Sequence, residues 1–247
     1  MLTITVSGMH GGVGATAIVA NLSAALQQQG LRCLCIDANA DNMLRLALAV
    51  NPEETLGWAK SSLTHSAWQD ATLQHEDGRW VLPFGELNVD ELARFIPTWA
   101  SSESPLHDIF YELQSLPLDC VVIDGPRSRL LPHYSLPSVD LTLYVAAPDA
   151  ASYALLKQDA KNWQSPNSRI LINRLQPAQE LASAIASFIA DDFEERMVPC
   201  VVHEDLIVAE AQAELSSVIG CAPDSQAAQD FQSLALWCQS ELQSREK

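Results

Sequence analysis

The sequence predicts a doubly wound α/β domain, with a mostly parallel β-sheet and helices on both faces. Three features predict this fold: short apolar runs typical of buried strands, segments of helical periodicity between them, and a glycine-rich turn directly after the first run. The chain has 247 residues, a length that suits one such domain. We therefore expect a single domain over residues 1–247, built on about seven strands.

The first unit of the fold is a strand, a glycine turn and a helix. Residues 2–7 (LTITVS) predict a strand, residues 8–14 (GMHGGVG) a turn, and residues 16–29 a helix that ends at Gly30. Further strands are expected at 31–36, 80–84, 120–123, 141–146, 170–172 and 198–202, and a helix over 149–163 with Asp149 as its N-cap. Ligands of such sheets bind at the carboxyl ends of the strands, so the site is expected in the turns that follow them.

Residues 51–118 and the end of the chain have sequence patterns of their own. Residues 51–118 fit the alternation less well, because they contain four tryptophans (58, 68, 80 and 99) and five prolines. We expect helices and loops around one strand there, with the tryptophans either packed inside or forming a partner-binding surface. The last helix is expected over about 224–243, and its apolar face docks on the core rather than on a bilayer because its end is mixed in charge. That face comprises Phe231, Leu234, Ala235, Cys238 and Leu242.

The charge of the chain excludes some classes of partner. There are 31 acidic and 14 basic residues, for a net charge of −17. Such a surface repels phosphate backbones and anionic lipid, so we expect no nucleic-acid partner. No segment reaches the roughly 18 apolar residues of a spanning helix, and residues 1–7 do not resemble a secretion signal. We therefore expect a cytoplasmic protein without direct membrane insertion; peripheral attachment to the inner membrane through protein partners stays open.

The six cysteines lack the paired spacing of a disulfide framework or zinc site. Cys33 and Cys35 lie in one predicted strand, and the alternation of strand side chains places both on one face. They are either reduced thiols in the core or a redox or metal pair.

The glycine-rich turn is the most informative segment. Its glycines allow successive backbone N–H groups to converge on an anion, and the start of the following helix adds partial positive charge. This predicts a phosphate site made of Gly11, Gly12, Val13, Gly14, Ala15 and Thr16. The strict Walker A pattern fails, since Met9 stands in place of its first glycine and Ala15 in place of its lysine.

Polar residues at the ends of other predicted strands support this site. Asp37 and Asp124 each follow an apolar run, where a carboxylate holds Mg²⁺ directly or through water, and the Thr16 hydroxyl is a third candidate. Asn173 follows residues 169–172 and is a candidate for recognising a purine edge. The alternatives are that the two aspartates are helix caps or loop residues and that Asn173 is a turn residue.

In this order, the motifs resemble the MinD/ParA group of deviant Walker A ATPases, which have the P-loop NTPase fold. The matching motifs are GGVG at 11–14, IDAN at 36–39, VVIDGP at 121–126, INR at 172–174 and VHED at 202–205. Within that group the chain is most similar to the BcsQ family of cellulose-biosynthesis proteins. This similarity rests on the lysine-free loop, on IDANADNMLRL at 36–46, LPFG at 82–85, ILIN at 170–173 and LALWC at 234–238.

The resemblance implies ATP and Mg²⁺ as cofactors and a face-to-face homodimer with nucleotide between the subunits. It also implies two kinds of partner: a small companion protein resembling BcsR, and other components of the cellulose synthase complex. The expected nucleotide contacts are the phosphate loop (Gly11–Thr16), His10, Ala17, Asn173, Arg174 and His203, with residues 201–205 closing over the base, and the expected metal-side residues are Thr16, Asp37 and Asp124.

Three departures from the wider group bear on hydrolysis. His10 and Ala15 stand where most members have lysines, and Asn39 stands for the second aspartate of a D-x-D motif. Loss of such electrostatic stabilisation typically costs about 10²–10³ in rate per group, and an amide is a poor proton acceptor. We therefore expect a nucleotide-dependent regulatory or assembly protein with slow or absent hydrolysis. His10 is either a phosphate contact or a plain loop residue.

There are three alternatives to a nucleotide-dependent regulatory or assembly protein. A cycling MinD/ParA-type positioning ATPase is disfavoured by Asn39, Ala15 and the acidic surface, although regulation of another envelope system stays open. A dinucleotide-dependent enzyme is disfavoured because the glycine spacing does not match G-x-G-x-x-G. A nucleotide-free structural protein with the same fold is the third.

Overall fold

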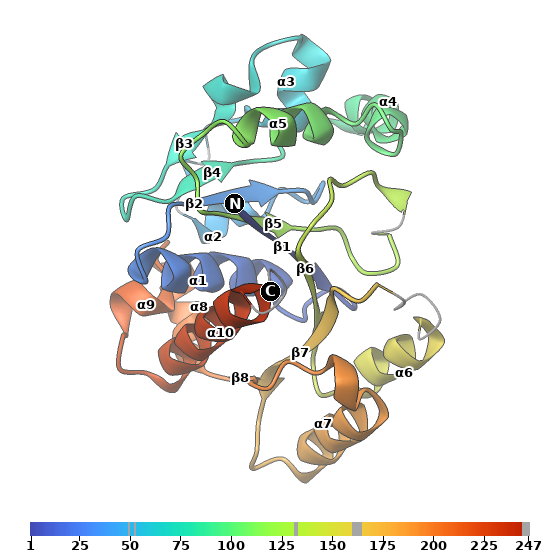
Figure 1. Cartoon of the computed structure of the whole chain (residues 1–247), viewed down its shortest axis with the longest axis vertical. Helices are drawn as coiled ribbons and strands as arrows, with labels where there is room; N and C mark the ends of the chain where they lie inside the picture. The colour runs from blue at the N-terminus through green and yellow to red at the C-terminus, as the bar shows by residue number, and fades with distance from the viewer. Residues whose placement is uncertain (49, 52, 131–132, 160–164, 244–247) are drawn as a thin grey trace.

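A computed structural model describes residues 1–247 except 49, 52, 131–132, 160–164 and 244–247, and the side chains at 242 and 243 are also outside it. An eight-stranded sheet runs through the centre of the molecule in the order β3-β4-β2-β5-β1-β6-β7-β8 (Figure 1). The strands are β1 (Leu2–Gly8), β2 (Cys33–Asp37), β3 (Leu73–Gln74), β4 (Trp80–Leu82), β5 (Cys120–Asp124), β6 (Leu141–Ala146), β7 (Ser168–Leu175) and β8 (Val202–His203). All neighbours pair in parallel except β3 and β4. The predicted doubly wound α/β fold is confirmed.

One face of the sheet is covered by helices from both ends of the chain. They are α1 (Ala15–Gln28), α2 (Leu44–Ala47), α8 (Leu206–Ala213), α9 (Val218–Cys221) and α10 (Gln226–Gln243). The first of them, α1, packs against α2, α9 and α10, and their apolar side chains join Ile4, Val6 and Val122 in the largest core cluster. The last helix thus docks on the core through Phe231 and Leu234. The side chain of Leu242, expected on the same face, lies outside the described residues.

Within the residues that the structure describes, five helices and two short 3₁₀ turns cover the opposite face. They are α3 (Trp58–Thr64), η1 (Trp68–Ala71), α4 (Val89–Trp99) and α5 (Pro105–Leu113) beside β2–β5, and α6 (Ala150–Asp159), α7 (Glu180–Asp192) and η3 (Glu194–Arg196) beside β6 and β7. Strand alternation explains the two faces, because Val122 belongs to the first core while Val121 and Ile123 belong to this second one. The expected helix over 149–163 is α6, and residues 160–163 lie outside the described part.

The tryptophan-containing region forms its own aromatic core. The Trp58 ring lies 5.2 Å from that of Phe84, 5.4 Å from Phe95 and 5.6 Å from Trp99, all edge to face. Such pairs add about 0.5–1.5 kcal/mol beyond burial of their area. Packing is therefore confirmed for Trp58 and Trp99, whereas Trp80 is 40% exposed.

Some strand boundaries differ from the prediction. The region 51–118 contains two strands, because the two-residue β3 pairs antiparallel with β4. The strand expected over 198–202 is wrong, since β8 comprises Val202–His203 alone. Residues before it do approach β7, through a bridge from Met197 to Ile170, but Pro199 has no N–H to continue the ladder.

The cysteine pair lies where strand alternation predicts. Cys33 and Cys35 are both fully buried in the first core, and their thiols are free. Burial raises the pKa of Cys35 to about 12, so this thiol is un-ionised at neutral pH. Among the described residues, no helix combines the length and hydropathy that a membrane crossing requires.

Candidate functional site

The glycine-rich loop forms the wall of a pocket at the carboxyl ends of β1, β2 and β5. It connects β1 to α1, and two of its glycines have left-handed backbones, Gly12 with φ +84° and Gly14 with φ +87°. The pocket has a volume of about 310 Å³. It is lined by Gly8, His10, Gly11, Gly12, Val13, Gly14, Ala15, Thr16, Ala17, Asn39, Asp41, Met43, Asp124, Gly125, Arg127 and Gln212.

The start of α1 presents uncapped backbone donors to this pocket. Gly14 is the N-cap of α1 and supplies no side-chain acceptor, and no acidic residue lies in the first turn. The first N–H groups of a helix have no partner within the helix, and together they carry partial positive charge. Because Ala15, Thr16 and Ala17 line the pocket, these donors are available to an anion.

Two buried aspartates lie side by side at the ends of neighbouring strands. Asp37 on β2 is directly in register with Asp124 on β5, and both are at most 1% exposed. The Thr16 hydroxyl donates to Asp124 Oδ2 at 2.7 Å, while Asp124 Oδ1 is buried without any hydrogen bond. By contrast, both oxygens of Asp37 accept backbone N–H groups, from Asn39 and Leu44, each at 2.9 Å.

Burial makes ionisation of this pair costly. Burial raises the pKa of Asp124 to about 7, although the hydrogen bond from Thr16 opposes the shift. The pKa of Asp37 is also raised well above its usual range, first by burial and then by the charge of Asp124. Two buried carboxylates on neighbouring strands in register favour a cation beside them.

The donor set fits Mg²⁺. This ion prefers oxygen ligands and is held in proteins by one or two carboxylates together with substrate phosphates and water. The unpaired Oδ1 of Asp124 and the adjacent Thr16 hydroxyl are such oxygens at the floor of the pocket. Asp37 does not line the pocket, and it fastens the loop after β2 through its two backbone bonds. Its role beside the metal stays a prediction.

Asn173 and Arg174 brace the phosphate loop from the end of β7. Asn173 Nδ2 donates to the Val13 carbonyl at 2.7 Å, and Arg174 Nη1 donates to the Gly12 carbonyl at 3.1 Å. The Arg174 guanidinium also pairs with both oxygens of Glu204, at 2.7 and 3.0 Å. Neither residue lines the pocket, so their contacts with nucleotide remain predictions while their contacts with the loop are observed.

His203 lies farther along the same edge. Its backbone N–H donates to Asp230 Oδ2 at 2.8 Å, and its Nδ1 lies 2.9 Å from the same oxygen. This fastens β8 to α10, which begins four residues before Asp230. His203 does not line the pocket, and closure of residues 201–205 over a base stays a prediction.

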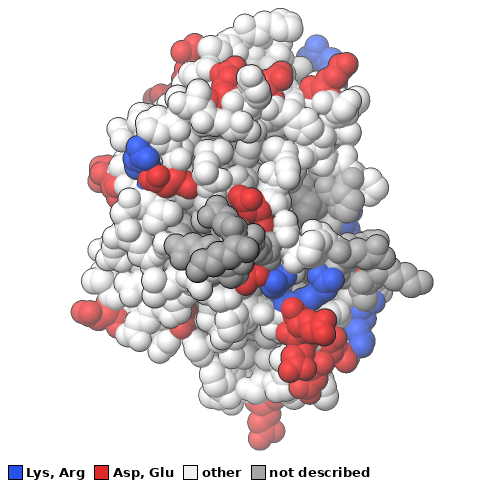
Figure 2. Space-filling model, in the orientation of Figure 1, with Lys and Arg blue, Asp and Glu red and all other residues white. Residues whose placement is uncertain are grey.

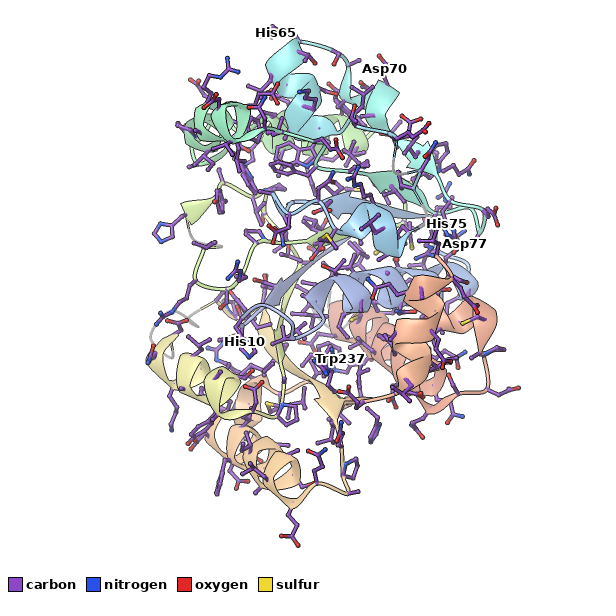
Figure 3. The ribbon with its side chains drawn as sticks, turned by 180° about the vertical axis from the view of Figure 1, so that it is seen from behind. His10, His65, Asp70, His75, Asp77 and Trp237 are labelled. Atoms are coloured by element: carbon purple, nitrogen blue, oxygen red, sulfur yellow. The ribbon has the colours of Figure 1, made fainter. Side chains whose placement is uncertain are left out.

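His10 lies in the pocket wall but is held by its own chain. Figure 3 shows it on the loop between β1 and α1, on the side of α6. Its Nδ1 lies 2.8 Å from the Gly11 carbonyl, which only accepts, so this nitrogen carries a proton. Its Nε2 lies 3.1 Å from Ser152 Oγ and 3.3 Å from Asp149 Oδ1, at the start of α6. The ring therefore links the phosphate loop to α6.

Comparisons with known proteins agree with this geometry. The family model described as "Cellulose biosynthesis protein BcsQ" matches residues 1–239. The chain belongs to the BcsQ family. The cellulose biosynthesis protein BcsQ of Escherichia coli (strain K12) is 31% identical over 249 residues, which cover 96% of this chain and 94% of that protein.

Solved structures with the same fold include nucleotide-bound ones. MinD of Pyrococcus horikoshii, solved with Mg-ADP, superposes with a TM-score of 0.74 at 22% identity, covering 95% of this chain and 94% of that one. Cobyrinic acid a,c-diamide synthase of Mycobacterium smegmatis, solved with an ATP analogue and magnesium, gives 0.71 at 19% identity, covering 95% and 93%. At these identities the likeness establishes the fold of this BcsQ-family chain.

The structure adds pocket residues that the motifs did not indicate. Asp41, Met43, Arg127 and Gln212 all line the pocket. Asp41 and Met43 follow Asn39 within the IDANADNM run, so their proximity to the motif was a usable signal. Arg127 and Gln212 come from a loop and from α8, where no local pattern distinguishes them from ordinary surface residues.

Proposed function

We propose that this BcsQ-family chain binds ATP with Mg²⁺ in the pocket beneath the phosphate loop, and that the bound nucleotide controls assembly of a homodimer. The observation that carries the proposal is the buried carboxylate of Asp124, with one oxygen bonded to Thr16 and the other unpaired. A carboxylate in this state favours a divalent cation, and a divalent cation beside free helix-terminal amides favours a polyphosphate.

Different groups of the chain would bind the phosphates and the metal ion. The backbone N–H groups of residues 11–17 would bind phosphate oxygens, since the first turn of α1 has no competing side-chain cap. Thr16 and Asp124 would hold Mg²⁺, either directly or through water. When bound, this ion would neutralise charge on the phosphate oxygens.

Hydrolysis is expected to be slow or absent. Ala15 offers no cation where the P-loop lysine would stand, and His10 is tied to Ser152 and Asp149 of its own chain. Asn39 lines the pocket, but its amide cannot accept a proton as a carboxylate does. Binding and turnover are thus separable, because the loop keeps its backbone amides while its two lysines and the second aspartate of the motif are replaced.

The outer side of the loop is open to a second subunit. A Cβ added at Gly11 or Gly12 would meet nothing within 4 Å. A face-to-face dimer with nucleotide between the subunits uses this open side. Family membership supports a role with the cellulose secretion machinery, and we propose a small companion resembling BcsR and other cytosolic components of the synthase complex as its partners.

Calorimetry with parallel measurement of molar mass tests the binding. ATP, ADP and NAD are titrated into the protein with Mg²⁺ and with EDTA. We expect binding selective for the adenosine phosphates, stronger with Mg²⁺, and a dimer with ATP. Thr16→Ala removes the Mg²⁺ dependence, whereas Thr64→Ala, an exposed threonine at the end of α3, does not. No binding of ATP at millimolar concentration by the wild-type protein would refute the proposal.

A second pair of assays separates the remaining alternatives. Asn173→Ala is expected to weaken MgATP and magnesium tripolyphosphate equally if Asn173 only braces the loop through Val13. A loss confined to adenine nucleotides would instead support adenine recognition. Phosphate release is measured with and without partner; turnover of about 1–100 s⁻¹ would favour a cycling MinD/ParA-type ATPase.

A further inference from the structure

The proposed phosphate site lacks cationic compensation from its own loop. A triphosphate keeps net negative charge after it binds one Mg²⁺, and the carboxylates of Asp41 and Asp124 line the same pocket. The loop supplies Ala15 and a histidine tied to α6. In a chain with a net charge of −17, a distant cation cannot offset this deficit, because exposed charges are screened within about 10 Å in salt.

Among the lysines and arginines that the structure describes, Arg127 is the one that lines this pocket. It lies three positions after Asp124, and the backbone on both sides of it is fixed to β1. The Gly125 N–H donates to the Val6 carbonyl at 2.8 Å, and the Ser128 N–H donates to the Gly8 carbonyl at 2.9 Å. The Cα of Arg127 is therefore held beside the point where β1 enters the phosphate loop.

The side chain of Arg127 has no hydrogen bond or ion pair with any residue that the structure describes. Within the described part of the chain, every other lysine and arginine donates a hydrogen bond or forms an ion pair; these are Arg32, Arg45, Lys60, Arg79, Arg94, Arg129, Lys157, Arg169, Arg174 and Arg196. On the face shown in Figure 2, several of the blue basic side chains lie close to red acidic ones. Arg127 alone among them has no such partner, although acidic residues outnumber basic ones about two to one.

We infer that Arg127 binds the phosphate oxygens of the nucleotide and replaces, from the loop after β5, the cation that the phosphate loop lacks. The inference rests on the proposed function. A guanidinium matches phosphate bidentately and stays ionised at all relevant pH values. Arg127 can reach the ligand without breaking an ion pair with any described residue, so binding does not have to offset the loss of one.

Titration calorimetry of matched variants tests this assignment, with MgATP, MgADP, MgAMP and magnesium tripolyphosphate as probes. Arg127→Gln is expected to weaken MgATP by about 10- to 100-fold, the range of a hydrogen bond to a charged group, and tripolyphosphate similarly. AMP is expected to lose less. Arg127→Lys should lie between wild type and Arg127→Gln. The control is Arg129→Gln, which removes the same charge from the same loop but from a side chain paired with Gln158 and Asp159 outside the pocket.

Unfolding temperatures show whether weaker binding by a variant comes from the lost side chain or from a destabilised fold. Without nucleotide, Arg127→Gln should unfold close to the wild-type temperature, because the exposed side chain has no hydrogen bond or ion pair with the described residues that its loss would break. With MgATP it should show a smaller upward shift than Arg129→Gln. The inference would be overturned if Arg127→Gln bound MgATP and tripolyphosphate as tightly as Arg129→Gln does, while the wild type binds both ligands. That result would leave the proposed function standing. A wild type that binds neither would overturn both.

Discussion

Asp124→Asn tests the cost of the buried carboxyl in the metal-free protein. Burial raises the pKa of Asp124 from 3.8 to about 7, and each unit corresponds to about 1.4 kcal/mol, so ionising this carboxyl costs the folded state on the order of 4 kcal/mol. The folded-state pKa lies above the unfolded value. Stability is therefore greatest below pH 4 with respect to this group and falls as the pH rises through 7.

Asp124→Asn removes the cost of ionising the buried carboxyl but adds the smaller cost of an unpaired buried amide. Thr16 can still donate to the amide oxygen, whereas the new NH₂ group takes the place of a buried atom that has no partner. An unsatisfied buried donor costs about 1–3 kcal/mol. The net gain at pH 8 is then about 2 kcal/mol, or an increase in unfolding temperature of about 4–8 °C for a chain of this size.

Thermal unfolding in EDTA at pH 5 and pH 8 measures the effect. The variant should gain on wild type at pH 8 and lose most of that advantage at pH 5. Asp70→Asn, an exposed aspartate on η1 (Figure 3), serves as the control and should change little at either pH. With MgATP the order should reverse, because only the wild-type carboxylate can hold the ion. A variant that is no more stable than wild type at pH 8 would show that Asp124 is not the charged, desolvated group described above.

Two further changes test the framework of the fold. Gly57→Ala places a Cβ 2.1 Å from the backbone nitrogen of Gly85, so overpacking should destabilise the protein by about 1–3 kcal/mol in urea unfolding; an unchanged midpoint would contradict this close approach. Hydrogen bonds from His75 and Arg79 outweigh burial and hold the pKa of Asp77 well below its usual range. Its stabilisation is therefore fully present above about pH 5 and is lost progressively as the pH falls below 4 toward the lowered pKa of Asp77. Asp77→Asn should flatten that part of the unfolding-temperature profile; a slope like that of wild type would exclude Asp77 as its source.

The fold was predictable because its signals are local. A glycine turn between an apolar run and a helical period specifies a strand-loop-helix unit, and Asp124 could be assigned because it ends a buried run. The two-residue β3 has no such signal, since its pairing with β4 depends on a turn held by Arg79, which reaches the Ala20 carbonyl of α1 at 2.6 Å. Contacts between segments far apart in sequence leave no periodicity to detect.

The same reasoning explains the limits of the site prediction. Motif positions indicate which residues gather at one edge of the sheet, but not which way each side chain points. The motifs did not indicate that Asp37 and Asn173 are bonded to backbone groups of neighbouring loops, and the roles of these two residues toward a ligand stay predictions. A free arginine such as Arg127 is visible only once the partners of the other cations are known.

These contacts explain how a lysine-free loop keeps its shape. The left-handed Gly12 and Gly14 need no lysine to adopt their backbone, and the carbonyls of Gly12 and Val13 are held from β7 by Arg174 and Asn173. The geometry that converges the amides is thus maintained by side chains outside the loop, whose own positions 10 and 15 are His10 and Ala15 rather than lysines. The proposed nucleotide-dependent switch requires a loop that keeps this form without lysines, and the contacts from β7 are what hold it there.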